Sequence, residues 1–453
     1  MVAVLEKSLS MSQHHKPAHA QKPIIIVGAG WAGLSCAFEL VRQNKPVILL
    51  EAAPQAGGRA RSVLFGSDWV DNGQHLLMGA YEQTRSLLRN LQIPEEQSFV
   101  QRPFEFYLMD AHTSQCTRHL SFGSRTDPLS KLYHLYRAKG FSMAEKLTLL
   151  KFFAKLETLK TGALKGCSVA QFLKASGQSP TLIQQFWNPL VLAALSTPAA
   201  QSSAQIWVQT LKAVFAHPNG SQYFFPRVDL TRLLPTHILE YLSRKSTPIY
   251  YHQRVQGISL PQNGPMQVHT AKHSFEAQAV VLATPPLISR TLLQTAEHIA
   301  LEPLIQSLGH FHYQPIATTY IRFQEPLDLA APLIGLLNAS VDWIFDRRLC
   351  GQPHMLSAVM SARAVPPDRT IFIERLQAEL KSLFPHLSKP VAHRIIHEKQ
   401  AVFSCDIGVE DYRPSVQSAL KPLLLAGDYT QNPYPATLEG AVYSGIKAAK
   451  LLC

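Results

Sequence analysis

Three glycines near the N-terminus have a spacing that suits a pyrophosphate: Gly28, Gly30 and Gly33. After a buried strand, the first glycine of such a set makes a tight turn and the second lets the backbone approach the phosphates. The third lets the following helix pack closely on the sheet. Glu51 can accept hydrogen bonds from both hydroxyls of an adenosine ribose, while its charge would repel a 2′-phosphate. These four residues predict a dinucleotide site.

The flanking residues predict the strand, turn and helix that this chemistry needs. Ile24–Val27 is a continuous apolar run, as in a strand buried on both faces. A helical stretch then reaches about Gln43, where Asn44 favours a left-handed helix end and Pro46 prevents continuation. Val47–Leu50 is a second apolar strand. The segment is therefore predicted to be a βαβ unit whose helix N-terminus faces the phosphates.

Two further polar groups follow Glu51. Gly57 and Gly58 expose backbone N–H groups and Arg59 offers a planar charged fork, all suited to a diphosphate. Farther on, the run Asp71-Asn72-Gly73-Gln74-His75 is a polar cluster around a glycine, where backbone passes close to something flat or bulky.

Composition indicates a large folded protein. The chain has 453 residues, of which 46% are hydrophobic and 16% charged, and its formal net charge is +12. These values support a packed interior and argue against disorder and fibrous repeats. The six cysteines are scattered, which favours a reducing cytoplasm over a zinc knuckle or a disulfide framework. Residues 1–22 are predicted to be a disordered tail without a secretory signal, and no segment is predicted to cross a membrane.

The segment Ser130–Lys165 is predicted to be helical and amphipathic. It holds eight lysine or arginine residues and two acidic residues, Glu145 and Glu157. The resulting net charge of +6 is half of the chain's net charge of +12. It is either an ordinary solvated helix face or a face that rests on anionic lipid.

Strands return late in the sequence. Tyr250–Gln256, Met266–Thr270, Ala279–Ala283 and Leu423–Ala426 are predicted strands, and a last helix runs from about Thr437 to Leu452. Long helical insertions separate them, so we predict a nucleotide domain assembled from discontinuous segments. Its predicted parts are residues 23–95, 216–290 and 396–453, and the substrate domain comprises residues 96–215 and 291–395.

Several further blocks carry a family resemblance that covers about residues 23–450. They are Asp71-Asn72-Gly73-Gln74-His75-Leu76, Trp187-Asn188-Pro189-Leu190, Leu195-Ser196-Thr197-Pro198, Trp343-Ile344-Phe345-Asp346-Arg347, Arg413-Pro414, Ala426-Gly427-Asp428-Tyr429-Thr430 and Pro435-Ala436-Thr437-Leu438-Glu439-Gly440-Ala441-Val442. Together with the βαβ unit and Gly57-Gly58-Arg59, they resemble the flavin amine oxidase and phytoene desaturase superfamily. The closer resemblance is to the hydroxysqualene dehydroxylase family (squalene-associated FAD-dependent desaturases), from whose pattern Ser196 departs.

The resemblance implies an α/β fold: a Rossmann-like FAD-binding domain with an inserted mixed α+β substrate domain, as in amine oxidases. It implies FAD as the cofactor, and the final block has no cysteine, so we expect non-covalent binding. The residues implied in FAD binding are Gly28, Gly30, Gly33, Glu51, Gly57, Gly58, Arg59, Gly73, Gln74, Val255 (through its backbone, at the adenine), Gly427, Asp428, Thr437 and Leu438.

The implied activity is the reduction of hydroxysqualene to squalene with loss of water, in bacterial squalene and hopanoid biosynthesis. His75 is the candidate proton donor and Asp71 the residue that would orient it; the alternative is that this cluster only shapes the loop and binds FAD. Asp346 and Arg347 form a structural ion pair or line the site.

The sequence leaves other functions open. A carotenoid desaturase would run the flavin in the opposite direction, a flavin amine oxidase would release hydrogen peroxide, and a prenyl-lipid escort of the same fold would hold lipid without flavin chemistry. His393 and His397 have zinc-helix spacing but lie in a strand-like stretch, so no metal is expected. We expect no nucleic-acid partner and a cytoplasmic protein. Anionic membrane and other squalene-pathway enzymes remain possible contacts.

Overall fold

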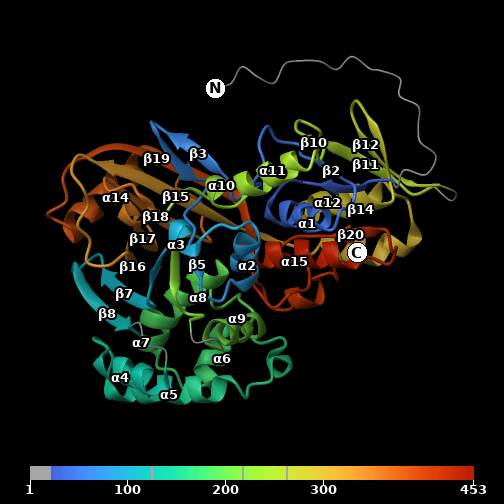
Figure 1. The fold of residues 1–453 in the computed structure, drawn as a ribbon. Coiled ribbons are helices and arrows are strands. Elements are labelled where there is room, and N and C mark those ends of the chain that lie inside the picture. Colours follow the sequence, from blue (N-terminus) through green and yellow to red (C-terminus); the bar gives the residue numbers. More distant parts are fainter. Residues whose placement is uncertain (1–21, 124–126, 217–218, 262–263) are drawn as a thin grey trace.

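The computed structural model describes residues 22–123, 127–216, 219–261 and 264–453. The predicted N-terminal tail therefore lies outside the described residues, apart from Lys22. Two lobes lie side by side, one around a five-stranded sheet and the other around a seven-stranded sheet, with a group of helices below the second (Figure 1).

The N-terminal βαβ unit is present as predicted. It comprises β1 (Ile24–Val27), α1 (Trp31–Arg42) and β2 (Val47–Leu50). Asn44 has a φ of 57°, which confirms the left-handed helix end.

Four segments far apart in the chain build one parallel sheet. Its strand order is β10-β2-β1-β14-β20, and the strands added to the first unit are β10 (Ile249–Tyr250), β14 (Ala279–Leu282) and β20 (Leu423–Leu425). All four residues of β1 and of β14 are buried, as expected for strands covered on both faces. The prediction of a discontinuous nucleotide domain is confirmed.

Alternate residues of this sheet enter two different cores. Ile24 and Ile26 pack with α1, α11 (Pro235–Arg244) and α15 (Leu438–Leu451). Ile25 and Val27 pack on the other face, with α12 (Pro286–Gln294) and the three-stranded sheet β11-β12-β13 (Val255–Ser259, Met266–Thr270 and Ser274–Ala277). The sequence predicted one strand over Tyr250–Gln256, and this is wrong. The chain leaves β2 after Tyr250, because His252 takes a φ of 56°, and Val255 starts a different sheet.

The second lobe contains a mostly antiparallel sheet in the order β19-β15-β18-β17-β16-β7-β8, with only β16 and β7 parallel. The helix α14 (Arg369–Leu383) covers one face, and the other face joins the core that reaches the five-stranded sheet. The strands are β19 (Pro390–Phe403), β15 (Tyr313–Phe323), β18 (Met355–Ser361), β17 (Trp343–Asp346), β16 (Leu333–Leu337), β7 (Glu105–Asp110) and β8 (Gln115–Ser121). Strand β19 includes His393 and His397, as predicted, and passes through the predicted domain boundary at 395/396.

The basic segment 130–165 is not one helix. It contains α4 (Pro128–Arg137), α5 (Met143–Leu156) and the short η1 (Thr161–Leu164). The break lies at Gly140, whose φ is 79° and where a Cβ would lie 1.9 Å from the carbonyl oxygen of Thr117. This close contact with β8 overrides the helical pattern. The lobe is completed by α6 (Val169–Ala175), α7 (Pro180–Leu182), the π-turn η2 (Ile183–Trp187), α8 (Asn188–Leu195) and α9 (Ala204–Ala216).

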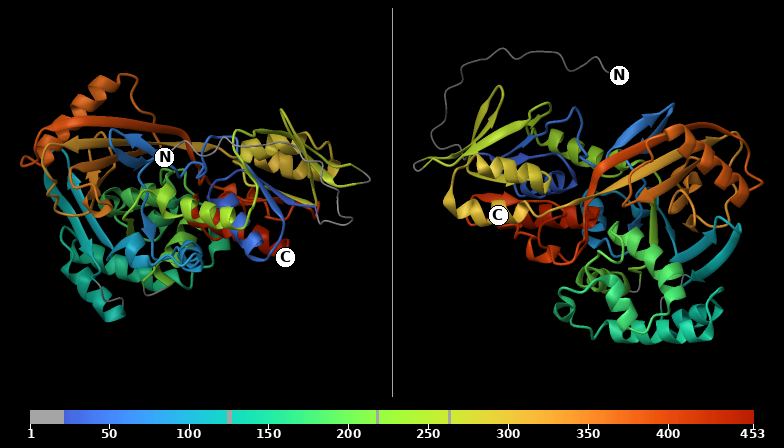
Figure 2. Two further views of the ribbon diagram at one scale, coloured as in Figure 1. Left: turned by 45° about the horizontal axis from the view of Figure 1, so that its top comes forward. Right: turned by 180° about the vertical axis from the view of Figure 1, so that it is seen from behind.

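Short elements connect the two lobes (Figure 2). They include a hairpin and a three-stranded sheet in the order β5-β9-β6. The remaining bounds are β3 (Ser62–Phe65), β4 (Asp68–Asp71), β5 (Leu77–Met78), β6 (Phe99–Arg102), β9 (Tyr223–Pro226), α2 (Glu82–Asn90), α3 (Glu95–Ser98), α10 (Leu230–Leu233), α13 (Glu302–Leu308), η3 (Ile299–Leu301), η4 (Arg347–Cys350) and η5 (Val409–Asp411).

Candidate functional site

The glycine turn after β1 leaves a bare helix N-terminus. Gly30 is the N-cap of α1, no side chain caps that helix, and no acidic residue lies in its first turn. Gly28 has a φ of 104° and a Cβ there would lie 2.6 Å from the Ala283 carbonyl oxygen. At Gly33 a Cβ would lie 1.9 Å from the Gly28 carbonyl oxygen. Gly28 and Gly33 are therefore required by packing alone, whereas a Cβ on Gly30 would meet only the Gly58 Cα, at 3.9 Å.

Glu51 holds the turn in place. Its Oε2 accepts the backbone N–H of Ala29 at 2.7 Å, and its Oε1 accepts that of Ala53 at 2.7 Å. Each carboxylate oxygen keeps a lone pair for a further hydrogen bond. The predicted ribose contact is thus compatible with these bonds.

Gly57 and Gly58 lie directly beside Gly30. The Gly57 N–H donates to the Ala29 carbonyl at 2.9 Å, and a Cβ on Gly58, where φ is 61°, would lie 3.1 Å from the Gly30 Cα. Two glycine-rich turns from different parts of the sequence thus form one backbone surface, as close approach of a pyrophosphate requires.

Arg59 connects this surface to the C-terminal loop. Its Nη2 lies 3.0 Å from the Asp428 carboxylate, and its Nη1 donates to the Ala401 carbonyl at 2.8 Å. The N–H of Gly427 donates to the Ser444 hydroxyl of α15 at 2.8 Å. The structure therefore brings together two pairs of predicted cofactor residues that are far apart in sequence, Gly58 with Arg59 and Gly427 with Asp428.

The last helix, α15, begins as predicted. Thr437 is its N-cap and accepts the Gly440 N–H at 3.1 Å, and Leu438 is the first helical residue. Glu439, to which the sequence assigned no role, is fully buried and accepts the backbone N–H groups of Gln83 and Thr84. Burial raises the pKa of Glu439. This carboxylate fixes the position of α2 against the helix.

Asp71 does not orient His75, in contrast to the sequence-based prediction. The buried Asp71 carboxylate accepts the Leu230 N–H at 2.7 Å and the Ser62 hydroxyl at 3.2 Å, and the same hydroxyl contacts Asp229. Burial raises the pKa of Asp71 to about 6. Asp71 is the last residue of β4, and its side chain bonds to the start of α10 rather than to the following loop.

His75 instead bonds to its own loop. Its Nδ1 lies 2.8 Å from the Gly73 carbonyl oxygen, and a carbonyl oxygen can only accept. In the neutral ring the proton is therefore on Nδ1, and Nε2 carries a lone pair. Burial, opposed by that hydrogen bond and aided by the nearby Arg59 charge, lowers the pKa of His75. The neutral form thus predominates at pH 7.

A buried polar network around Gln74 was not predicted from the sequence. The Gln74 Oε1 accepts from Arg347 at 2.6 Å and from Ser357 at 2.8 Å, and the Gln74 N–H donates to Thr318 at 3.2 Å. Arg347 is 2% exposed and its guanidinium lies 5.1 Å from the centre of the Tyr320 ring. Alternation along β15 places Thr318 and Tyr320 on one face, but no sequence signal pairs them with the loop at Gly73.

The proposed Asp346–Arg347 ion pair is wrong. Asp346 pairs with Arg348 at 2.6 Å, and the Arg347 Nε donates to Gln352 at 2.5 Å. Asp346 is the N-cap of η4 and accepts the Arg348 N–H, so the turn directs its carboxylate to Arg348. Arg347 points the other way, into the Gln74 network.

Val255 is buried at the start of β11, next to the end of β10. The connecting segment is fixed to the dinucleotide end, because the Gln253 N–H donates to the Glu51 carbonyl at 2.9 Å. The backbone of Val255 therefore follows closely on the loop that closes β2, which is compatible with the predicted adenine contact.

Several buried side chains have a polar atom without a partner among the described residues. They include the indole N–H groups of Trp207 and Trp343 and the hydroxyl of Tyr313. Trp343 packs edge-on against Phe106 in the apolar core between the seven-stranded sheet and the helices. Burial raises the pKa of Tyr313, beside Arg59, to about 12, so its hydroxyl stays protonated. The two indole N–H groups are free donors within the apolar core, whereas Tyr313 lies near the charges of Arg59 and Asp428.

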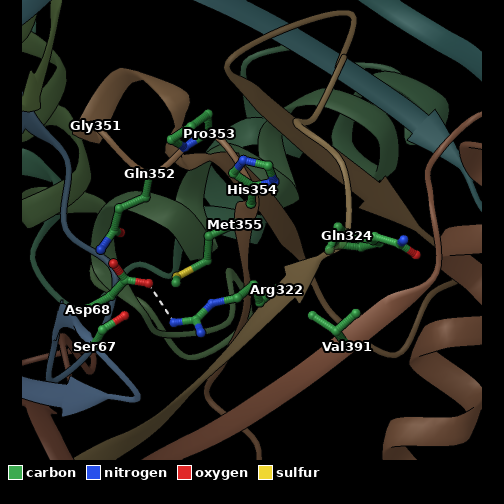
Figure 3. Close-up of a pocket in the computed structure, with 11 residues that line it drawn as sticks. Ser67, Asp68, Arg322, Gln324, Gly351, Gln352, Pro353, His354, Met355 and Val391 are labelled. Atoms are coloured by element: carbon green, nitrogen blue, oxygen red, sulfur yellow. Dashed lines mark hydrogen bonds and ion pairs between the residues drawn. The ribbon is translucent and has the colours of Figure 1, made fainter.

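A pocket of about 500 Å³ lies elsewhere, between the β3–β4 turn, the end of β15 and the loop after η4. Asp68 and Arg322 form an ion pair at 2.5 Å inside it, and His354 and Val391 line its rim (Figure 3). None of the predicted site residues lines this pocket, so it is separate from the candidate site. Among the described residues no group of His, Cys, Asp and Glu could hold a metal ion.

The residues present fit FAD. The uncapped N-terminus of α1, the backbone at Gly30 and the adjoining Gly57–Gly58 turn form a cradle for a diphosphate. Arg59, which directly follows Gly58, joins this cradle to the C-terminal loop through its ion pair with Asp428. When bound, FAD supplies hydride transfer at its ring system.

The comparisons with known proteins agree on one family. Residues 31–453 match the family described as flavin containing amine oxidoreductase, so the chain belongs to that family. The chain is similar to a hydroxysqualene dehydroxylase of Sinorhizobium fredii (26% identical, covering 95% of this chain and 98% of that protein). It is also similar to a hydroxysqualene dehydroxylase of Zymomonas mobilis (23%, covering 94% and 98%) and to a 15-cis-phytoene desaturase of Solanum lycopersicum (24%, covering 100% and 81%).

Solved structures show the same fold. Cyclohexylamine oxidase from Brevibacterium oxydans superposes with a TM-score of 0.70 at 16% identity, covering 95% of this chain and 98% of that one. An oxidoreductase from Methanosarcina mazei superposes with a TM-score of 0.71 at 14% identity, covering 94% and 100%. The fold class and the cofactor inferred from the sequence are confirmed: the chain is an FAD-dependent oxidoreductase.

Proposed function

We propose that this member of the flavin containing amine oxidoreductases reduces hydroxysqualene to squalene in bacterial squalene and hopanoid biosynthesis. The observation that carries the proposal is that this chain and its relatives named hydroxysqualene dehydroxylase match over nearly their whole lengths. The chain covers 98% of three relatives named hydroxysqualene dehydroxylase, but only 78–81% of the plant phytoene desaturases. FAD would be bound without a covalent link by the residues predicted above.

The surroundings of the proposed site suit a long hydrocarbon. One continuous apolar core joins the sheet face at Phe106 and Trp343 to helix residues such as Phe186 and Trp207. A substrate with thirty carbons and one hydroxyl would bury apolar surface there, and the few free donors, such as the Trp343 N–H, would meet its single oxygen.

The reaction breaks the allylic C–O bond and forms a C–H bond. Its balance needs one hydride, which reduced FAD supplies when bound, and one proton for the departing water. We assign that proton to Nε2 of His75, because the Gly73 carbonyl holds Nδ1 and turns Nε2 away from it. The lowered pKa makes the protonated ring a minor but strong acid. Apolar walls exclude water from the carbocation-like centre.

Asp71 does not act in this chemistry as a direct partner of His75. Its hydrogen bonds to Ser62 and Leu230 make it a structural group below the loop. We propose that Gln74, held by Arg347 and Ser357, fixes the loop that carries His75 and Gly73.

The test is product analysis under anaerobic conditions. The flavin of the purified holoenzyme is first reduced with a stoichiometric amount of reductant. The enzyme is then incubated with hydroxysqualene, and squalene is measured by gas chromatography and mass spectrometry. The expected result is one squalene per flavin reoxidised. If folded protein that carries reduced flavin forms no squalene, the proposal is overturned.

The second candidate function is carotenoid desaturation, favoured by the phytoene desaturases among the relatives. Oxidised enzyme incubated with phytoene tests it, since a desaturase would reduce its flavin while forming a new double bond. An amine oxidase would instead release hydrogen peroxide from an amine, which a peroxidase assay detects.

A further inference from the structure

Helix α4 turns an apolar stripe toward solvent. Leu129, Leu132, Tyr133 and Tyr136 are three or four residues apart and thus lie on one face of the helix. All four are exposed, Leu129 by 78% and Tyr136 by 64%, whereas Leu135 points into the core. A stripe of this kind is the opposite of an ordinary surface helix, whose outward face is polar.

Helix α5 repeats the pattern. Leu149, Phe152 and Leu156 are buried, and the opposite face carries Met143 and Leu147, exposed by 57% and 54%. Leu150 and Ala154 continue this exposed face at helical spacing. Seven of the seventeen large apolar side chains exposed in the described part of the chain lie in α4 and α5. Such a concentration marks an interaction surface.

Basic residues border the two stripes. Lys146 and Lys151 fall on either side of the Leu147–Leu150 face of α5, and Arg137, Lys139 and Lys155 are exposed nearby. The acidic Glu145 does not offset them, because both its oxygens bond to Arg118 on β8, at 2.8 and 3.1 Å. Within the described residues, no ion pair involves any of these five cations.

The two helices form one outer edge of the molecule. They run along the bottom of the view in Figure 1 and along the same edge from behind in Figure 2, with no other element outside them. Lys146 joins them, since its Nζ donates to the Tyr136 carbonyl at 2.5 Å and lies 5.7 Å from the centre of that tyrosine ring. On their inner side, Leu149 and Phe152 belong to the core that continues to Trp343.

We propose that α4 and α5 form a docking surface for an anionic lipid bilayer. The surface is defined by the exposed apolar residues Leu129, Leu132, Tyr133, Tyr136, Met143, Leu147 and Leu150 and by the cations Arg137, Lys139, Lys146, Lys151 and Lys155. The helices lie in the plane of the interface, with leucine and methionine among the acyl chains, tyrosine at the headgroup level and lysine on the phosphates. A predominantly positive border around an apolar centre fits anionic lipid better than a protein partner.

The docking surface would also explain how a water-insoluble substrate reaches the core. This consequence rests on the proposed function, because it assumes a hydrocarbon that partitions into the bilayer. The docking itself does not, since it follows from exposure and charge.

The first experiment measures the apolar contribution. Holoenzyme is co-sedimented with vesicles of phosphatidylcholine and phosphatidylglycerol, without substrate. The double variant Leu147→Glu/Leu150→Glu should bind at least about tenfold more weakly, because two leucines leave the acyl region. The matched control is Ile299→Glu/Ile371→Glu, which alters two exposed apolar residues elsewhere, 85% and 62% exposed, and should bind like the wild type.

The second experiment measures the charge contribution. Lys151→Gln/Lys155→Gln should lose roughly thirtyfold in binding to the anionic vesicles, at about 1 kcal/mol for each lysine, and little on phosphatidylcholine alone. High salt should reproduce that loss. Lys245→Gln/Lys272→Gln, two exposed lysines on the other lobe, is the control and should leave binding unchanged.

Two results would overturn the docking surface. One is vesicle binding that is absent, or that responds equally to the variants and their controls. The other is a dimer in light scattering that dissociates in Leu147→Glu/Leu150→Glu, which would make a second copy the occupant. Because flavin content and vesicle binding are read without substrate, failure here is distinct from failure of squalene formation.

Discussion

The glycine turn at Gly28 and the loop at His75 lie in the same site but are built differently. Around Gly28, most contacts join backbone atoms, those of residues 28–58 and the Ala283 carbonyl, and the Glu51 carboxylate accepts two backbone N–H groups. In the loop at His75, side chains from other elements take part: Thr318 on β15, Ser357 on β18 and Arg347 on η4 bond to Gln74, and the Arg59 charge lies near His75.

The difference reflects what each end must recognise. A diphosphate has the same shape in every protein that binds FAD, so a backbone surface with a helix N-terminus suffices and glycine spacing encodes it. The proposed reaction, at one carbon of a hydrocarbon, needs side chains fixed to within a fraction of an ångström, and packed elements of a sheet provide that.

Replacing Gly30 by glutamate tests the backbone surface and has the largest expected effect. The Gly30 φ of −71° is ordinary, and the nearest atom to an added Cβ is the Gly58 Cα at 3.9 Å, so the chain should fold. A carboxylate facing the diphosphate should weaken FAD binding about a thousandfold or more. Flavin absorbance of the purified protein and circular dichroism measure the two effects.

Gly33→Ala is the matched control within the same turn. Its Cβ would lie 1.9 Å from the Gly28 carbonyl oxygen, so we expect misfolded protein rather than a folded apoprotein. A Gly30→Glu variant that purifies with the wild-type flavin content would show that the diphosphate does not bind at this turn.

Replacing His75 by phenylalanine tests the side-chain end. Without the Nε2 proton, squalene formation should slow by about a hundredfold while the flavin stays bound. The lowered pKa of His75 adds a pH signature: wild-type turnover should rise as pH falls toward and below 6.5, because only the protonated ring donates. The variant should lose that rise. Equal turnover of both proteins across this pH range would remove His75 from the mechanism.

Asp71→Asn separates structure from chemistry at the same loop. The folded-state pKa of about 6 lies above the ordinary value of 3.8, so this group's contribution to stability is complete below 3.8 and is lost as pH rises through 6. The loss amounts to about 3 kcal/mol, and the asparagine variant lacks it. Urea unfolding at several pH values should therefore show that the free energy of unfolding of the variant rises relative to that of the wild type between pH 4 and 7. Parallel curves would contradict the raised pKa.

The local sequence allowed the backbone turns and helix ends of the candidate FAD site to be predicted in detail. The turn at Gly28, the left-handed Asn44 and the N-cap Thr437 are all where the sequence places them, because each depends on neighbours within one or two turns of chain. Errors appear where a distant contact overrides the local pattern. Gly140 breaks a helix because β8 approaches it, and Asp71 turns to α10 instead of His75.

By itself, the sequence determined the dinucleotide turn, the discontinuous sheet and the positive surplus in 130–165, since spacing, hydrophobic runs and charge are properties of a chain. Tertiary structure decided which side chains meet at the site and which face of α4 and α5 remains uncovered. Those outcomes depend on the packing of β15, β18 and η4 against a loop more than two hundred residues earlier, and local pattern carries no record of such distant partners.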